Sequence, residues 1–114
     1  MIEKLFLVDS DQVRRSLFEG IFKERIYTLA SYNDALFRIK DFSPQVILMG
    51  TEVGQGLSRE QVKEILGTEI PLVFIGTLEE FENLEQNRCY QAYLRKPISP
   101  LEVEREIEKI LFST

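Results

Sequence analysis

The sequence contains no histidine, and this absence removes most catalytic schemes. Ser-His-Asp and Cys-His catalysis need an imidazole as base, and phosphohistidine chemistry needs one as acceptor. Common zinc and iron sites depend on imidazoles or on several thiolates, whereas this chain has one cysteine, Cys89. Because no histidine is available to activate that thiol, we interpret Cys89 as a spectator. We therefore expect a protein that is not an enzyme and that needs neither a cofactor nor a metal.

Long hydrophobic runs and clustered basic residues are missing as well. No apolar run approaches the ~20 residues of a bilayer span, and the first residues lack the apolar core of a signal peptide. A single cysteine cannot form an internal disulfide, which suits a reducing, cytoplasmic environment. The formal net charge is −5, and the basic residues are scattered among more numerous acids. These features argue against binding to nucleic acid or to an anionic membrane.

Short apolar runs of strand length alternate with helical patterns along all 114 residues. The run at residues 46–49 has no polar alternation, which indicates a strand covered on both faces, at the centre of a parallel sheet. The other predicted strands are residues 5–8, 26–30, 72–75 and 92–94. The order predicts one domain over residues 1–114, with an α/β fold in which helices cover both faces of a doubly wound five-stranded parallel sheet.

Local signals place the first two helices and one loop. Asp9-Ser10-Asp11 is suited to cap a helix whose apolar residues recur at helical spacing; these are Val13, Leu17, Phe18, Ile21 and Phe22. Ser31 is the predicted cap of the second helix, which directs Ala35, Leu36 and Ile39 inward. The stretch 50–56 contains three glycines and is predicted to be a loop, with Gly54 and Gly56 forming a turn.

Several short motifs lie at the ends of the predicted strands. They are Leu7-Val8-Asp9, Ser43-Pro44, Gly56-Leu57, Ile70-Pro71 and Tyr93-Leu94-Arg95-Lys96-Pro97-Ile98. Together they carry a resemblance, over essentially the whole chain, to the receiver domain of two-component response regulators. The lysine-proline motif is the most specific of them. The resemblance implies a flavodoxin-like (βα)5 fold of the CheY type.

In active receivers, the resemblance implies, an aspartate ending the third strand accepts a phosphoryl group. A magnesium ion is held by that aspartate and by an acidic pair after the first strand, while a threonine or serine and a lysine bind the phosphoryl oxygens. In this sequence Gly50 stands at the acceptor position and Gly76 at the threonine position. Asp9 keeps the first acid, Ser10 replaces the second, and Lys96 keeps the lysine. The pattern indicates a degenerate pseudo-receiver that is not phosphorylated.

Two alternatives concern charged residues near this position. Glu52 could join Asp9 and Asp11 around a divalent ion, since hard cations prefer clustered carboxylates; otherwise Glu52 is a solvated loop residue and Asp11 a helix cap. Lys96 could be an ordinary surface lysine, but we favour its pairing with Asp9 across the crevice at the strand ends. Thr77, one residue past Gly76, is expected on the opposite side of the strand.

Two functions are compatible with these features. The first is a phosphorylation-independent protein-interaction module, which uses the face of the fourth helix, fifth strand and fifth helix to bind a protein partner or a second copy. That face is predicted to present some of Phe81, Leu84, Tyr93, Leu101 and Phe112, beside the acidic residues Glu79, Glu80, Glu82 and Glu85. Phe81 and Leu84 could instead pack the fourth helix onto the sheet, which is the interpretation we favour for Leu84. The second is a small-ligand sensor, because Gly50 and Gly76 are expected to hollow the crevice where doubly wound folds bind nucleotides or flavins. Tyr93, at the aromatic switch position, could point outward or into that space.

Overall fold

The computed structural model describes residues 1–84, 92–95 and 99–112. Its five strands are β1 (Leu5–Val8), β2 (Ile26–Leu29), β3 (Val46–Gly50), β4 (Leu72–Gly76) and β5 (Ala92–Arg95). Its helices are α1 (Gln12–Phe22), the 3-10 turn η1 (Lys23–Arg25), α2 (Ala35–Phe42), α3 (Thr51–Gln55), α4 (Arg59–Gly67), α5 (Leu78–Leu84) and α6 (Pro100–Phe112). The strands form one parallel sheet in the order β2-β1-β3-β4-β5. As predicted, β3 is central and β2 lies at an edge.

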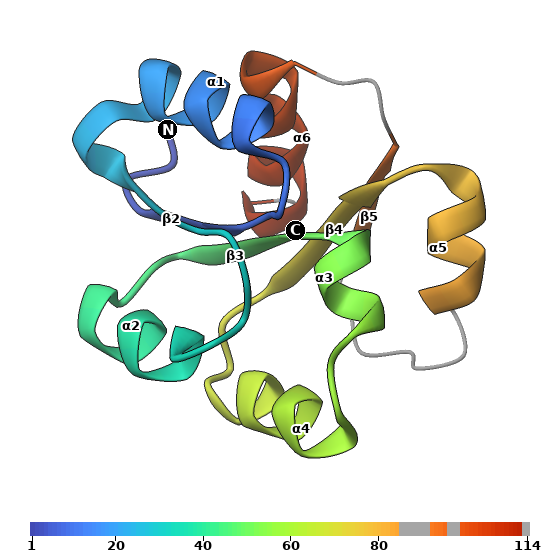
Figure 1. Ribbon diagram of the computed structural model, residues 1–114. Helices are drawn as coiled ribbons and strands as arrows, with labels where there is room; N and C mark the ends of the chain where they lie inside the picture. The colour runs from blue at the N-terminus through green and yellow to red at the C-terminus, as the bar shows by residue number, and fades with distance from the viewer. Residues whose placement is uncertain (85–91, 96–98, 113–114) are drawn as a thin grey trace.

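Helices cover both faces of the sheet, which confirms the predicted α/β architecture (Figure 1). Helices α1 and α6 lie on one face, and α2, α3, α4 and α5 lie on the other. Both faces of the central strands are therefore shielded from water, which is why their sequences are continuously apolar. The fifth helix predicted from the sequence is α6, and the fourth is α5.

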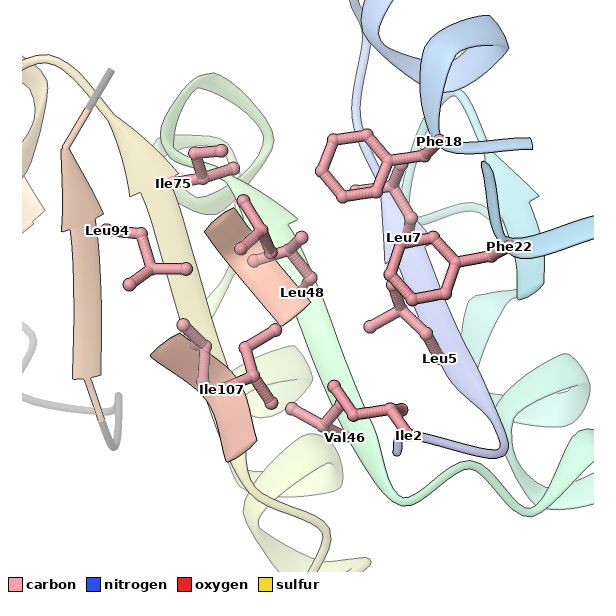
Figure 2. Packing of buried hydrophobic residues seen from close by; sticks show 12 residues of the cluster. Ile2, Leu5, Leu7, Phe18, Phe22, Val46, Leu48, Ile75, Leu94 and Ile107 are labelled. Carbon is pink, nitrogen blue, oxygen red and sulfur yellow. The ribbon is translucent and has the colours of Figure 1, made fainter. Parts of the chain in front are cut away.

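The hydrophobic core is divided by the sheet into two clusters. Leu5 and Leu7 of β1 and Leu48 of β3 point toward α1 and α6, where Phe18 and Phe22 pack against them (Figure 2). All of these side chains are buried almost completely. Because residues of one strand alternate between faces, the intervening ones, such as Phe6, belong to the cluster beneath α2 and α4.

Side-chain caps fix the starts of α1, α4 and α6 and, as described below, of α5. Asp11 caps α1 by accepting hydrogen bonds from the backbone N–H groups of Val13 and Arg14, as the sequence predicted. Ser58 and Gln61 form a reciprocal capping box at α4. At α6, proline is the first helical residue and the Ser99 hydroxyl accepts from the N–H of Glu102.

Two local predictions were wrong. Ser31 does not cap α2: the cap position is Asp34, which has a left-handed backbone (φ 58°) and makes no side-chain cap bond. The predicted loop at 50–56 contains the short helix α3 instead. Gly54 belongs to that helix because it packs tightly on β4, where a Cβ at this position would lie 2.4 Å from Cε1 of Phe74.

The apolar residues of α1 divide into two groups. Phe18 and Phe22 are buried against the sheet, whereas Val13, Leu17 and Ile21 have 69%, 57% and 42% of their surface exposed. The sequence pattern identified the helix, but it did not show which apolar residues face the core. None of the helices in the described part of the chain is long and apolar enough to cross a membrane.

Tyr32, which follows β2, is buried in the second cluster, and its hydroxyl has no hydrogen-bond partner among the described residues. Burial raises its pKa from 10.0 to about 12, and the negative charge of Glu64 adds to the increase. The folded state therefore keeps the phenolic proton at pH values where the unfolded chain has lost it. The contribution of the neutral Tyr32 phenol to the free energy of unfolding is present below pH 10 and is lost as the pH rises toward about 12.

We predict that Tyr32→Phe raises the free energy of unfolding by about 1 kcal/mol at pH 7, because it removes a buried polar group that has no partner. The advantage should grow by about 1.4 kcal/mol by pH 11, which is one unit above the pKa of the unfolded chain and about one unit below that of the folded state. Urea denaturation at pH 7 and near pH 11 measures both effects, with Tyr27→Phe as the matched hydroxyl deletion. A Tyr32→Phe protein less stable than wild type at pH 7 would contradict the prediction.

Candidate functional site

The candidate site lies where β1 and β3 end, side by side at the carboxyl edge of the sheet. The strand order reverses direction between these two strands, and crevices at such switch points are the usual ligand sites of doubly wound sheets. Asp9 directly follows β1, and Gly50 is the last residue of β3. The structure brings these two together, since a Cβ on Gly50 would lie 3.1 Å from Cγ and Oδ1 of the Asp9 side chain.

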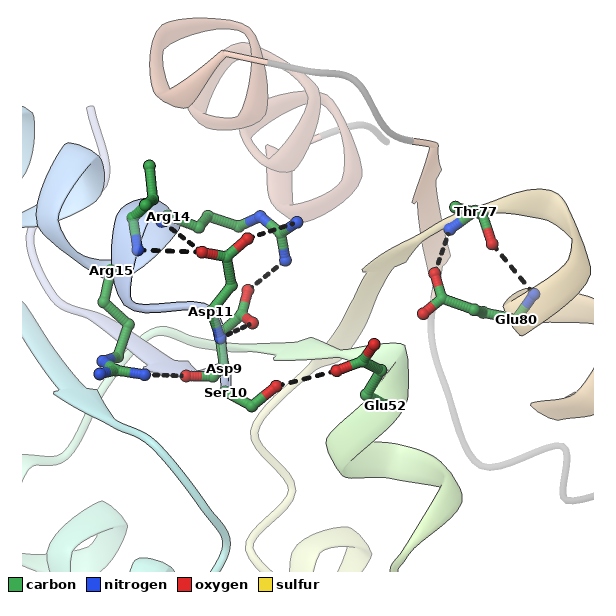
Figure 3. Close-up of polar contacts among 9 residues, drawn as sticks. Asp9, Ser10, Asp11, Arg14, Arg15, Glu52, Thr77 and Glu80 are labelled. Carbon is green, nitrogen blue, oxygen red and sulfur yellow. Dashed lines mark hydrogen bonds and ion pairs between the residues drawn. The ribbon is translucent and has the colours of Figure 1, made fainter.

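Asp9 is a buried carboxylate neutralised from within the chain (Figure 3). Only 2% of its surface is exposed. Oδ2 forms an ion pair with Nη1 of Arg14, and Oδ1 accepts a hydrogen bond of 2.9 Å from the N–H of Asp11. The Arg14 side chain is itself 16% exposed, and its Nη2 lies 3.6 Å from Oδ2 of Asp11. A guanidinium group thus occupies the space between the two acids.

A second arginine reinforces this arrangement, because Nη1 of Arg15 donates a 2.7 Å hydrogen bond to the main-chain oxygen of Asp9. Lys96, the partner of Asp9 that we favoured from the sequence, lies outside the described residues. Arg14 was not predicted as a partner. The signal was present in the sequence, since Arg14 stands three residues after the cap Asp11, in the first turn of a helix that starts at the end of β1.

The three carboxylates proposed for a divalent ion are separately engaged. Asp11 caps α1, Asp9 pairs with Arg14, and Oε2 of Glu52 accepts a 3.0 Å hydrogen bond from the hydroxyl of Ser10. Across residues 1–84, 92–95 and 99–112, no group of three histidine, cysteine or acidic side chains is placed to hold a metal ion. Of the two interpretations of Asp11, the structure supports the helix cap.

The hollow expected at Gly76 is filled, so that prediction was wrong. Thr51, the first residue of α3, occupies the space: a Cβ on Gly76 would lie 2.1 Å from its Oγ1 and 2.6 Å from its Cγ2. Thr51 is fully buried, and its hydroxyl has no hydrogen-bond partner in the described part of the chain. Since Asp9 stands against Gly50 in the same way, neither glycine leaves an open crevice.

An open groove of about 430 Å³ lies beside the site, toward β2 and α4. Its lining residues are Ser10, Ala30, Ser31, Tyr32, Asn33, Glu52, Val53, Gly56, Leu57 and Gln61. Glu52 is the one charged residue in this set, and its charge is negative. A groove without a cation is poorly suited to the phosphate groups of nucleotides or flavins.

Thr77 lies between the end of β4 and the first residue of α5. Its N–H donates a 2.8 Å hydrogen bond to Oε1 of Glu80, and its hydroxyl accepts one of 3.2 Å from the Glu80 N–H (Figure 3). This reciprocal pair satisfies two backbone donors at the beginning of the helix. Thr77 therefore does not replace the side chain missing at Gly76.

Tyr93 links β5 to the end of β4 and to α5. Its hydroxyl donates a 2.8 Å hydrogen bond to the main-chain oxygen of Gly76, and its ring stacks on Phe81 with centroids 3.9 Å apart and planes inclined by 18°. Both side chains are half-buried. Burial raises the pKa of Tyr93, with Glu80 adding to the effect and Arg95 opposing it. The sequence left the direction of Tyr93 open, and the structure gives its hydroxyl a main-chain partner.

The predicted interaction face is assembled only in part. Leu101 on α6 and Leu78 on α5 are exposed, and so are Glu79 and Glu82 of α5. Leu84 is buried and fixes α5 to the sheet. Phe112 is exposed at the opposite end of α6 from Leu101, so it belongs to a different part of the surface. Glu85 and Cys89 lie outside the described residues.

No protein-family model and no curated protein sequence matches this chain. Several solved structures do match it. The receiver domain of NtrX from Brucella abortus aligns with a TM-score of 0.76 at 22% identity, covering 97% of this chain and 100% of that domain. The chemotaxis response regulator CheY4 of Vibrio cholerae gives 0.75 at 17% identity, covering 96% and 99%. A longer NtrX structure gives 0.77 at 23% identity, and there this chain spans 27% of the other protein's length. The chain therefore has the flavodoxin-like fold of response-regulator receiver domains.

Proposed function

We propose that this chain is a phosphorylation-independent protein-interaction module of a signalling pathway, built on the receiver fold. The observation that carries the proposal is the buried Asp9–Arg14 pair. In active receivers the acid at the position of Asp9 helps to hold magnesium. Here that acid is paired with the guanidinium group of Arg14. Gly50 offers no carboxylate to accept a phosphoryl group. Phosphoryl transfer needs both a positioned nucleophile and cations aimed at the transferred oxygens.

The similarity to receiver domains supports a signalling role over a catalytic one, and it supports a cytoplasmic location. The module would act through the α5–β5–α6 face, defined by Leu78, Phe81, Tyr93 and Leu101. Leu78 is exposed on α5 together with the acids of that helix, Leu101 is exposed on α6, and the stacked rings of Phe81 and Tyr93 join α5 to β5. A mixed apolar and acidic face fits a protein partner that has an apolar centre and a basic rim.

The small-ligand alternative depended on a crevice hollowed by Gly50 and Gly76. Thr51 and Asp9 fill that space, and among the described residues the neighbouring groove is lined by no cation for a phosphate-bearing ligand. The observations therefore favour the interaction module.

The proposal predicts that incubation with a small phosphodonor and magnesium leaves the intact mass unchanged, while a conventional receiver treated in parallel gains a phosphoryl group. It also predicts a partner in the native lysate that is retained equally with and without the phosphodonor. Leu78→Glu/Leu101→Glu should lose that partner, because two charges are placed at the apolar part of the face.

Phe37→Glu is the matched control, since Phe37 is equally exposed but lies on α2. The control variant should retain the partner. A stable phosphoryl adduct on the wild-type protein would disprove the proposal, and so would a partner that still binds Leu78→Glu/Leu101→Glu with unchanged affinity.

A further inference from the structure

The open groove toward β2 and α4 has the composition of a binding site for a small molecule. Its walls come from Ser10 after β1, residues 30–33 after β2, and Glu52 and Val53 of α3, with further residues before and within α4. Its volume of about 430 Å³ lies within the range of small-molecule pockets. None of the described residues that line it belongs to α5, β5 or α6, so the groove is separate from the proposed partner-binding face.

The charge on the groove wall is negative, because Glu52 is the one charged residue among the described lining residues. Its Oε2 accepts the hydrogen bond from Ser10, which holds the carboxylate in place (Figure 3), while Oε1 has no partner in the described part of the chain. Arg14 and Arg15 of α1 are bound to Asp9 and do not line the groove. The net charge of −5 adds a general attraction for cations.

The other lining residues are neutral and combine hydrogen-bonding groups with a small apolar surface. Ser31 and Asn33 supply a hydroxyl and an amide, and Val53 and Leu57 supply the apolar part. Gln61 also lines the groove, and its side-chain oxygen is already used in the capping box of α4. An aliphatic chain that ends in a hydrogen-bond-donating cation complements such a surface.

Tyr32 forms part of the groove wall and carries a polar group that lacks a partner. The residue is 8% exposed, and its hydroxyl makes no hydrogen bond among the described residues. The negative charge of Glu64 on α4 contributes to the raised pKa of this hydroxyl, so the surroundings of Tyr32 are negative as well. A buried polar group without a partner costs stability, and a ligand that bonds to it would account for its presence.

We propose that this groove binds a small amino alcohol, that is, an aliphatic compound with an ammonium group at one end and a hydroxyl group at the other. The ammonium group pairs with Oε1 of Glu52, and the aliphatic part covers Val53 and Leu57. The ligand hydroxyl bonds to the hydroxyl of Tyr32, since a hydroxyl can either donate or accept there. The absence of a cation among the described lining residues selects against anionic compounds of the same size.

NMR of the backbone amide groups, at constant ionic strength, tests the preference for a cation. Added 4-aminobutanol should shift the signals of Ser31, Asn33 and Val53 until they saturate, with a dissociation constant of the order of 1 mM. The probe 4-hydroxybutyrate, which has the same length and a negative charge, should give no saturable shift.

Two matched substitutions identify the carboxylate that binds the ammonium group. Glu52→Gln should weaken binding of 4-aminobutanol at least about tenfold, while its amide oxygen can still accept from Ser10. Glu60→Gln removes the same charge from an exposed position in the first turn of α4 that does not line the groove, and it should change the affinity less than about twofold. The dispersion of the amide signals checks that both variants remain folded.

A third probe, n-butylammonium, lacks the hydroxyl group and tests the contact with Tyr32. The wild-type protein should bind 4-aminobutanol at least about threefold more tightly than n-butylammonium, whereas Tyr32→Phe should bind the two equally. Tyr27→Phe, which does not alter the groove, should keep the preference.

The proposal is overturned if 4-aminobutanol gives no saturable shift up to about 20 mM, if 4-hydroxybutyrate binds as well, or if Glu52→Gln binds with unchanged affinity. A preference for 4-aminobutanol that persists in Tyr32→Phe overturns the contact with Tyr32. None of these results bears on the α5–β5–α6 face, which the groove does not touch.

Discussion

Replacing Arg14 by methionine should lower the free energy of unfolding by about 3–5 kcal/mol, because it leaves the buried carboxylate of Asp9 without its cation. Asp9 has almost no access to water, and within the described residues its other side-chain hydrogen bond comes from the N–H of Asp11. Methionine keeps most of the length and apolar contact of the arginine side chain, so the loss reports mainly on charge. Urea denaturation at pH 7 measures the effect.

Two further variants separate the buried pair from general effects of removing an arginine. Arg38→Met, at an exposed position on α2, should change stability by less than about 0.5 kcal/mol. The double variant Asp9→Asn/Arg14→Met should recover a large part of the loss, since no buried charge remains to be neutralised. A cost below about 1 kcal/mol for Arg14→Met alone would show that this ion pair does not neutralise Asp9.

Gly76→Ala should destabilise the protein by about 2–3 kcal/mol, although alanine is among the smallest possible changes. Its Cβ would lie 2.1 Å from Oγ1 of Thr51, a side chain that is fully buried and has no room to move aside. Gly67→Ala is the matched control, because a Cβ there meets nothing within 4 Å. That control should be neutral or stabilising by up to about 1 kcal/mol.

Thr51→Ala should restore at least half of the stability lost in Gly76→Ala. It removes the Oγ1 and Cγ2 contacts, while the Cβ of residue 51 remains 2.8 Å from the added carbon and must still shift. The two substitutions should therefore show a favourable coupling above about 1 kcal/mol in a double-mutant cycle. Additive effects would mean that Thr51 does not occupy the space beside Gly76. Coupling would also show that a side chain at position 76 requires a compensating change at position 51.

The sheet could be predicted from the sequence because parallel strands buried on both faces leave a strong signal. The run 46–49 and its neighbours are continuously apolar, and Asp11, Ser58 and Ser99 provide explicit helix starts. Helix α3 gave no such signal. Gly54 within it and the flanking glycines favour a turn when considered locally. Only the packing of Gly54 on Phe74 shows why a glycine belongs in that helix.

The position of the candidate site could be predicted from the sequence, but the side chains that fill it could not. Asp9 and Gly50 do lie together at the strand ends, as the order of the elements implies. The identities of the groups that fill the space depended on tertiary geometry. A glycine in a sequence indicates a missing side chain, but Thr51 shows that a neighbour can occupy the vacated volume. Similarly, the spacing of Val13, Leu17 and Ile21 does not reveal that the helix is rotated to bury Phe18 and Phe22 instead.

The hydrogen bond from Tyr93 to Gly76 ends on a main-chain oxygen, and this has an evolutionary consequence. Every amino acid supplies that oxygen, so mutation at position 76 cannot delete the acceptor. The orientation of Tyr93 therefore does not depend on which amino acid stands at position 76. A substitution at position 76 can therefore cost stability through its contact with Thr51 and still leave the acceptor of the Tyr93 hydroxyl in place.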